Sequence, residues 1–361
     1  MTIFTLIMFV VGLAMVTAGA DLFVRGASRL AIAIGVSPLV IGLTVVAYGT
    51  SAPELAVCLQ ASAAGSSDIA VGNVVGSNIC NILLILGLSS VVAPLVVSRQ
   101  LTRTDVPLMI GISVLLLVMS LDGRIGRLEG LLLFTGSVTY TVVVIRASRR
   151  ATKKAEAANG GHVAEKIGFA ARWFWPVVFV VAGVAVLVLG ADWVKDGAIE
   201  IARFFAISEL IIALTIVAIG TSLPEIATSV MAAVHGERDI AVGNAVGSNI
   251  FNILLVIGLT ALVSPSGIAV SSGALRFDMP VMIAVAIGSL PIFTTGHMIR
   301  RSEGLFFLLY FAAYTAFLIF NAGNHETLTM RDTAFMVFIV PLVVITFVII
   351  VKRVWQQRRS G

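Results

Sequence analysis

The sequence predicts an all-α membrane protein that crosses the bilayer many times and is built from two inverted five-helix repeats, followed by an additional helix. First, the chain is 58% hydrophobic and only 12% charged, whereas a soluble domain carries about 25% charged residues. Second, apolar runs of about 20 residues, the length that spans a bilayer as a helix, recur along the chain. Third, residues 41–87 recur at 212–258, where 29 of the 47 positions are identical at a constant offset of 171 residues.

The apolar segments predict eleven spans, with the longest polar stretch between the fifth and the sixth. The expected spans lie near residues 3–24, 38–64, 69–93, 105–121, 127–145, 174–194, 209–234, 240–263, 276–295, 302–321 and 333–351. The chain is expected to consist of a first repeat, a basic cytoplasmic linker, a second repeat and an additional helix with a basic tail, at residues 1–145, 146–172, 173–322 and 333–351. Because five is odd, the second repeat enters the membrane from the opposite side, so a pseudo-two-fold axis in the membrane plane relates the repeats.

The first span and the basic residues predict the orientation. No positive charge precedes the first apolar run, and Gly19 and Asp21 recur as Gly190 and Asp192, so this run is expected to remain as a helix rather than to be a cleaved signal. With the N-terminus outside and the C-terminus in the cytoplasm, the inner segments contain 18 of the 24 Lys and Arg residues, as the positive-inside bias requires. The formal charge of +5 therefore reflects orientation, and no nucleic-acid partner is expected.

The second and seventh spans are predicted to be broken helices. The second span, 38–64, would be about 40 Å long as a straight helix, which is more than one crossing needs. Gly and Pro weaken its middle, so we expect a break near Gly49–Pro53 and another near Gly220–Pro224. Carbonyls near the breaks would lose their intrahelical donors and become available to a hard cation, since freed carbonyls persist at membrane depth only in a protein interior or a wet cavity. These carbonyls belong to Ala47, Tyr48, Ala218 and Ile219.

Each predicted break contains one glutamate, Glu54 in GTSAPELA and Glu225 in GTSLPEIA. An acid at the centre of a membrane helix costs about 2.5–3.5 kcal/mol on insertion scales. The alternative is a capping role, because Ser51 and Glu54 have the spacing of a capping box and could begin a new helix segment. A neutral glutamine would cap without this cost, so two acids in symmetric places favour a central cation site.

The third and eighth spans add neutral oxygens. Polar residues at four-residue intervals share one helix face; they are Asn73, Ser77 and Asn81, repeated as Asn244, Ser248 and Asn252. Helix packing is the alternative, because Gly72 and Gly76 form a small-xxx-small contact, and we expect both roles to hold. Asn78 and Asn249 point elsewhere and are expected to pack or to bridge backbone groups.

The resulting candidate metal site contains only oxygen donors. Its predicted members are Glu54, Glu225, Thr50, Ser51, Thr221, Ser222, Ser77, Ser248, Asn81, Asn252 and the carbonyls of Ala47 and Ala218. Such a shell suits Ca²⁺, which takes 6–8 oxygen ligands, and Na⁺ could use subsets of it. Cys58 and Cys80 are expected to be core residues, while Asp105 and Asp278, at the mouths of two spans, are candidates for an ion conduit.

The paired blocks G-T-S-x-P-E and D-I-A-x-G-N-x-x-G-S-N-x-x-N resemble the alpha repeats of sodium/calcium exchangers, within the calcium/cation antiporter superfamily. The resemblance covers about residues 1–322, and without a large insert between the halves the chain is similar to compact prokaryotic members. It implies a prokaryotic inner-membrane protein in which Glu54 and Glu225 bind Ca²⁺ and share in Na⁺ binding, and the other predicted oxygens complete the ion sites. It also implies that the first and sixth spans form a mobile unit.

The expected function is secondary active antiport of Na⁺ against Ca²⁺ by alternating access at a midplane site, with no tightly bound cofactor and no enzymatic reaction. One Ca²⁺ or several Na⁺ would neutralise the two acids. Some relatives, including potassium-dependent ones, carry an acid where Asn252 stands. Here both Asn81 and Asn252 are neutral, which argues against K⁺ co-transport. The alternative is an antiporter of Ca²⁺, or of another divalent cation, against H⁺, in which protons replace sodium. A cation channel would need an open pore rather than inverted halves.

Overall fold

The computed structural model describes residues 3–66, 68–158, 173–207, 209–294 and 296–322. Within these residues, eight helices are long and apolar enough to cross a membrane, and two bent helix pairs bring the candidate spans to ten. The prediction of an all-α membrane protein is therefore confirmed. The predicted eleventh helix at 333–351 lies outside the described residues, as do residues 159–172 of the predicted linker.

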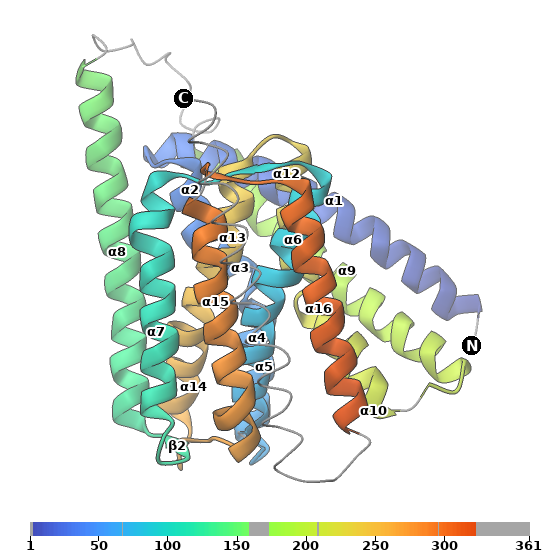
Figure 1. The fold of residues 1–361 in the computed structure, drawn as a ribbon. Coiled ribbons are helices and arrows are strands. Elements are labelled where there is room, and N and C mark those ends of the chain that lie inside the picture. Colours follow the sequence, from blue (N-terminus) through green and yellow to red (C-terminus); the bar gives the residue numbers. More distant parts are fainter. Residues whose placement is uncertain (1–2, 67, 159–172, 208, 295, 323–361) are drawn as a thin grey trace, which may run out of the picture.

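The two repeats contain the same succession of elements (Figure 1). The first consists of α1 (Ile3–Ile34), α2 (Pro38–Ile41), the π-helical turn η1 (Gly42–Val46), α3 (Ala47–Thr50), α4 (Ala52–Ala63), α5 (Asp68–Cys80), η2 (Asn81–Ile85), α6 (Leu86–Val92), β1 (Leu95–Val96), η3 (Leu101–Asp105), α7 (Val106–Met119), β2 (Arg124–Ile125) and α8 (Arg127–Ala158). The second consists of α9 (Trp175–Phe204), α10 (Glu209–Ile212), η5 (Ala213–Val217), α11 (Ala218–Thr221), α12 (Leu223–Val234), α13 (Arg238–Phe251), η6 (Asn252–Ile257), α14 (Gly258–Val263), β3 (Ile268–Ala269), η7 (Ala274–Asp278), α15 (Met279–Thr294), β4 (Met298–Ile299) and α16 (Arg301–Ala322).

Two helices are longer than their apolar runs. The helix α1 continues past the predicted end at residue 24 to Ile34, and Gly35, with φ +71°, ends it in the left-handed conformation that glycine adopts most readily. Similarly, α8 continues past residue 145 to Ala158, because the first part of the predicted linker is rich in Ala, Lys and Arg, which favour helix. Hydropathy marks the apolar part of such a helix but not its end.

The third and eighth spans form the centre of the bundle. Within the apolar 18-residue stretch of each, 72% of the residues are buried in Ile69–Val92 and 78% in Arg238–Val263. In the corresponding stretch of α1, only 28% are buried. The helices that carry the predicted Asn and Ser ligands are therefore shielded from lipid by the others.

The helices α1 and α9 lie side by side and project away from the rest of the bundle (Figure 1). Glycines allow their backbones to touch: a Cβ on Gly19 would lie 2.5 Å from the amide nitrogen of Leu187. One on Gly183 would lie 2.6 Å from the amide nitrogen of Phe23. Real Cβ atoms do not approach backbone so closely, so these positions accept only glycine at the observed helix distance.

Two short strand pairs join the repeats. Strand β1 pairs with β4 in antiparallel fashion, with Leu95 opposite Ile299, and β2 pairs with β3, with Ile125 opposite Ile268. Because β1 and β3 occupy equivalent places in the two repeats, as do β2 and β4, the pairings are related by the pseudo-two-fold axis. Each repeat therefore supplies the backbone hydrogen-bonding groups that pair with the short strands of the other.

Both predicted helix breaks are present. The chain bends by 42° between Pro38–Thr50 and Ala52–Ala63, and by 58° between Thr215–Thr221 and Leu223–Val234. Ser51 and Ser222 occupy the two break positions, between helices that meet end to end. The bends confirm the prediction that Gly and Pro interrupt the helix in the middle of these two spans.

Candidate functional site

The two glutamates begin the second segments of the broken helices and are completely enclosed. Glu54 lies in the first turn of α4 and Glu225 in the first turn of α12, with 0% and 1% exposure. The Ser51 hydroxyl, from the break in the first repeat, donates to Oε1 of Glu225 at 3.3 Å. The two breaks therefore meet in the protein interior. No ion pair found among the described residues involves either glutamate.

Several buried oxygens among the predicted ligands have no hydrogen-bond partner in the described part of the chain. They are Oε1 and Oε2 of Glu54, Oε2 of Glu225, Oδ1 of Asn81, Oδ1 of Asn252, and the hydroxyls of Ser222 and Ser248. A buried polar group left unpaired typically costs about 1–3 kcal/mol, and more when it is charged. Carboxylate and amide oxygens can only accept, so a cluster of them fits a cation that binds several oxygens at once.

The capping alternative does not describe these residues. Neither Ser51 nor Ser222 makes a side-chain hydrogen bond to the amides of the helix that follows it. Ser51 instead reaches the glutamate of the other repeat. Glu225 therefore takes part in a contact between repeats, which a purely local capping role would not require.

The threonines that precede the breaks are held by hydrogen bonds. The Thr50 hydroxyl donates to Oδ1 of Asn244 at 3.1 Å, and the Asn244 amide donates to the Ser229 hydroxyl at 2.9 Å. The Thr221 hydroxyl donates to the carbonyl of Ala218 at 3.2 Å. Thr50 is thus tied to the opposite repeat and also to its own helix, where its hydroxyl lies 3.2 Å from the carbonyl of Val46, whereas the bond of Thr221 stays within its own helix.

The expectation that the Ala47 carbonyl loses its intrahelical donor is wrong, while its role as a ligand stays a prediction. The Ser51 amide donates to the carbonyl of Ala47 at 3.0 Å, so Ala47 keeps an intrahelical donor. The reason is that Ser51 is the C-cap of α3, and its amide still closes the last turn of that helix. Ala218, its counterpart, is exposed and lines a cavity, where its carbonyl accepts from Thr221.

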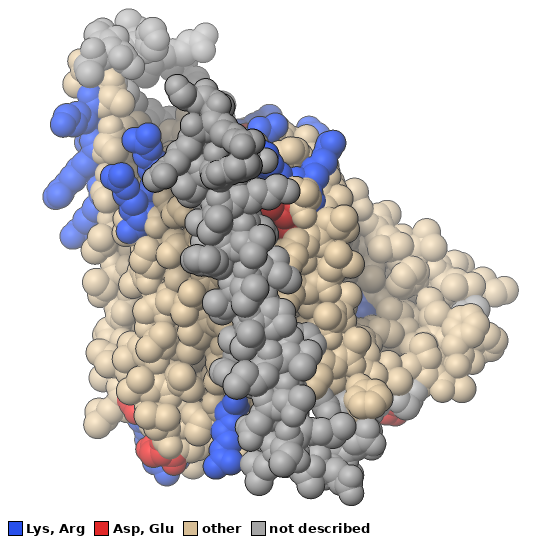
Figure 2. All heavy atoms as spheres, in the orientation of Figure 1, with Lys and Arg blue, Asp and Glu red and all other residues tan. Residues whose placement is uncertain are grey.

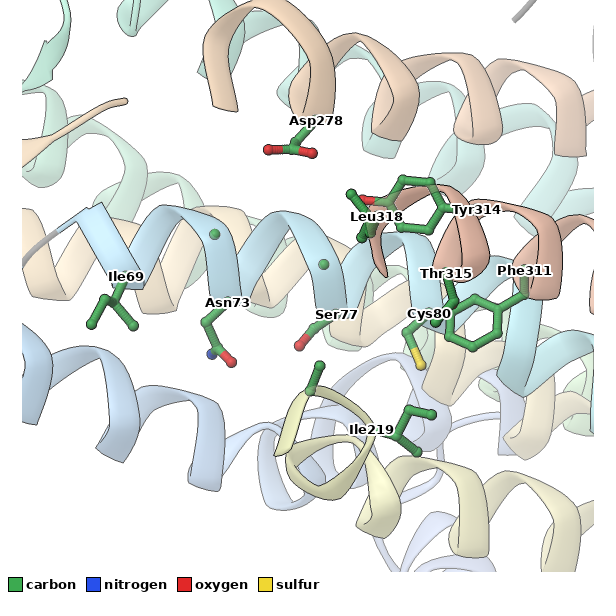
Figure 3. Close-up of a pocket in the computed structure, with 13 residues that line it drawn as sticks. Ile69, Asn73, Ser77, Cys80, Ile219, Asp278, Phe311, Tyr314, Thr315 and Leu318 are labelled. Atoms are coloured by element: carbon green, nitrogen blue, oxygen red, sulfur yellow. The ribbon is translucent and has the colours of Figure 1, made fainter. Parts of the chain in front are cut away.

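A cavity of about 410 Å³ leads to the predicted site from one side. It is lined by Asn73 and Ser77 of α5, Ala218 and Ile219 of α11, Asp278 of η7 and Tyr314 of α16, among others. Figure 3 shows Asn73 and Ser77 on the side of α5 that faces α11 and Ile219, while Asp278 lies on the other side of α5, as Tyr314 does. The cavity lining therefore includes Asp278, a candidate for an ion conduit, together with Ser77 and Ala218, two of the predicted ligands.

The two repeats pack their glycines differently. A Cβ on Gly243 would lie 2.8 Å from the carbonyl oxygen of Leu39, and one on Gly247 would lie 2.8 Å from Cα of Leu43. At the equivalent Gly72 and Gly76, both of which line the cavity, nothing lies within 4 Å of an added Cβ. The expected close approach of glycines to the broken helix is therefore present in α13 and absent in α5. One side of the site is closed and the other is open.

In the described part of the chain, eight long apolar helices and two bent pairs form two inverted halves, with paired buried acids and a one-sided cavity. This arrangement defines a membrane ion transporter rather than an enzyme. The family model described as Sodium/calcium exchanger protein matches residues 4–146 and 175–320. The chain belongs to the sodium/calcium exchanger family.

Individual relatives resemble the chain over most of its length. The inner membrane protein YrbG of Escherichia coli is 41% identical over 283 residues, covering 78% of this chain and 86% of YrbG. The sodium/calcium exchanger MaX1 of Methanosarcina acetivorans is 33% identical over 353 residues, covering 87% of this chain and 98% of MaX1. Among solved structures, the sodium-calcium exchanger NCX_Mj superposes with a TM-score of 0.73 at 30% identity, covering 88% of this chain and 100% of that one. The membrane location and the inverted-repeat fold agree with these relatives.

Proposed function

We propose that this chain exchanges Na⁺ for Ca²⁺ across the membrane by alternating access, at the oxygen cluster around Glu54 and Glu225. The observation that carries the proposal is the set of unpaired, buried acceptor oxygens contributed by both repeats. The other members of the site are Thr50, Ser51, Ser77, Asn81, Thr221, Ser222, Ser248, Asn252 and the carbonyls of Ala47 and Ala218. The cations are substrates that enter and leave.

The chemistry of the donors favours hard cations. Among the described residues, no group of three or more His, Cys, Asp and Glu side chains is placed to hold a metal. Two carboxylates with neutral oxygens match the ligand preference of Ca²⁺, which accepts flexible shells of 6–8 oxygens. The same two negative charges are neutralised by several Na⁺ at adjacent positions. An empty site leaves both acids desolvated and uncompensated, which disfavours closure without bound cations and links the two fluxes.

The unequal packing of the repeats supports alternating access. Exchanging the packing of the two glycine pairs would close the cavity beside Gly72 and Gly76 and open its counterpart beside Gly243 and Gly247. Inverted repeats supply two such states from nearly the same sequence. The cation site would then face first one side of the membrane and then the other.

The distribution of basic residues supports a cytoplasmic linker and an N-terminus outside. Figure 2 shows Lys and Arg gathered where α8 ends, and this end of α8 contains Arg146, Arg149, Arg150, Lys153 and Lys154. The cavity is lined by Ile69 near the start of α5 and Leu318 near the end of α16, toward the opposite end of the molecule (Figure 1). Since basic residues collect on the cytoplasmic side, this cavity opens to the outside.

Flux into proteoliposomes tests the proposal. Vesicles loaded with Na⁺ and diluted into Na⁺-free buffer should take up ⁴⁵Ca²⁺, whereas vesicles loaded with choline should not. Glu54→Gln and Glu225→Gln should each abolish this uptake, because each removes one of the two charges that Ca²⁺ neutralises. Glu209→Gln is the matched control: Glu209 is exposed and pairs with Arg203 at 2.7 Å, away from the site.

Three results would contradict the proposal in different ways. Uptake driven by a pH gradient in the absence of Na⁺ would identify protons as the counter-ion. Normal Na⁺-dependent uptake in either glutamate variant, if it is folded, would show that the substituted glutamate is not needed to bind Ca²⁺. Single-channel currents without counter-ion dependence would replace exchange by a pore.

A further inference from the structure

Four buried asparagines form one network where the two central spans cross. Asn78 lies in α5 and Asn81 in η2, while Asn249 lies in α13 and Asn252 in η6. All four are at most 2% exposed. Asn81 and Asn252 belong to the proposed cation site, but Asn78 and Asn249 have no part in it.

The hydrogen bonds of this network cross between the repeats. The side-chain amide of Asn81 donates to Oδ1 of Asn249 at 2.8 Å, and that of Asn252 donates to Oδ1 of Asn78 at 3.1 Å. The offset of 171 residues converts Asn78 into Asn249 and Asn81 into Asn252. The two bonds are therefore pseudo-symmetric copies of one contact.

Acceptor-only groups fix which way each asparagine points. The amide nitrogen of Asn78 donates to the backbone carbonyl of Asn249 at 3.3 Å, and a carbonyl cannot donate. The other terminal atom of Asn78, which faces Asn252, must then be its oxygen. Asn252 must present its nitrogen to that oxygen, which leaves Oδ1 of Asn252 unpaired.

The second pair is fixed by a thioether. The amide nitrogen of Asn249 donates to Sδ of Met109 at 3.4 Å, and a thioether sulfur can only accept. Asn249 therefore turns its oxygen to Asn81, whose nitrogen is used and whose Oδ1 is unpaired. The contact of the Asn78 amide with Sδ of Met282, at 3.6 Å, completes the same pattern on the first pair.

We propose that Asn78 and Asn249 are positioning residues, which hold the amides of Asn252 and Asn81 so that each turns an oxygen, and not an NH₂ group, toward the cations. This inference rests on the proposed function of the site. An amide that rotates freely offers either end, and its NH₂ end repels a cation. Groups that orient metal ligands in this way typically change metal affinity by about 10–100-fold when they are removed.

A double-mutant cycle on Ca²⁺ affinity tests the proposal, with ⁴⁵Ca²⁺ binding to the purified full chain measured in the absence of Na⁺. Asn249→Leu should raise the apparent Kd by about 10–100-fold. In an Asn81→Ala background the same substitution should change Kd by about 2-fold or less, because no amide remains to be oriented. The titration must reach Ca²⁺ concentrations that saturate the Asn81→Ala protein, so that a Kd can be measured in that background.

The cross-repeat pattern separates positioning from general destabilisation. Asn249→Leu should couple to Asn81→Ala and not to Asn252→Ala, although Asn252 is nearer in sequence; Asn78→Leu should show the reverse. Ser113→Ala is the matched control, since it removes a buried hydrogen bond to the carbonyl of Met109 within α7 and should leave Kd unchanged.

The inference would be overturned if the effects on Kd were additive, or if Asn249 coupled to Asn252 and Asn78 to Asn81. This holds for variants that match the wild type in size-exclusion chromatography and in thermal unfolding. Where a leucine variant does not yield folded protein, Asn249→Ser and Asn78→Ser enter the same cycles, because serine leaves room for water beside the amide. A wild-type protein that fails to bind Ca²⁺ would instead contradict the proposed function. The two failures are therefore distinguishable.

Discussion

The unequal glycine packing allows the two access states to be perturbed separately. Gly247 in α13 is packed against Cα of Leu43, while its counterpart Gly76 in α5 faces the cavity. Gly247→Ala therefore introduces a Cβ 2.8 Å from backbone on the closed side. Gly76→Ala introduces a Cβ into open space and meets an obstacle only when the second repeat closes on α5.

The size of the effect follows from this geometry. Because the obstructing atom at Gly247 is main chain, the helices must move apart, and overpacking of this kind costs about 1–3 kcal/mol. An energy of about 1–3 kcal/mol changes an equilibrium constant by about 5–150-fold. Gly247→Ala should shift the protein away from the observed state by this factor, and Gly76→Ala should shift it toward the observed state by a similar factor.

Labelling of a cysteine in the cavity measures the shift. Thr315→Cys places a thiol in the cavity lining, in a background where Cys58 and Cys80 are replaced by alanine. A membrane-impermeant maleimide added from the cavity side should react faster with Gly76→Ala and slower with Gly247→Ala than with the unmodified background. Both variants should exchange more slowly.

Equal labelling rates in the two glycine variants would refute this reasoning, as would unchanged exchange in Gly247→Ala. Gly111→Ala is the control, because nothing lies within 4 Å of its added Cβ, and Gly111 lies in α7, outside the cavity lining.

Three further perturbations have defined outcomes. Ser51→Ala removes the donor to the second glutamate and should raise the Kd for Ca²⁺ by about 10-fold in a binding titration, while the unfolding temperature stays within a few degrees. Gly183→Leu forces a side chain against the backbone at Phe23 and should separate α1 from α9, seen as loss of a crosslink between engineered cysteines and of exchange. Tyr140→Phe removes the 3.0 Å hydrogen bond to buried Asp105 and should lower the free energy of unfolding by about 1–3 kcal/mol in a denaturation assay.

The sequence predicted the features that depend on residue type. Apolar length predicted the spans, an odd number of spans per repeat predicted the inversion, and the Gly and Pro residues around Glu54 and Glu225 predicted the breaks. The sequence also predicted that Asn78 would either pack or bridge backbone groups, and its amide donates to the backbone carbonyl of Asn249. The assignment of the ion ligands themselves stays a prediction.

The sequence could not predict features that depend on which of two packings is present. Gly76 and Gly247 lie in nearly identical sequence, yet one faces a cavity and the other touches a neighbouring helix. In the same way, an asparagine such as Asn81 carries a donor and an acceptor of equal size, and only its partners determine which one faces the site. The end of α1 was missed because its last turns are helical but no longer continuously apolar.

The strand pairs between repeats limit how such a chain can be divided. A single repeat inserted alone would leave the backbone edge of β1 without the donor and acceptor groups that β4 provides. It would also leave the side-chain amide of Asn81 without the oxygen of Asn249. A half-length protein of this design must therefore insert in both orientations and assemble as an antiparallel dimer. When two such copies are joined in one chain, the odd number of spans in each copy forces the second to be inverted, which makes the pairing permanent.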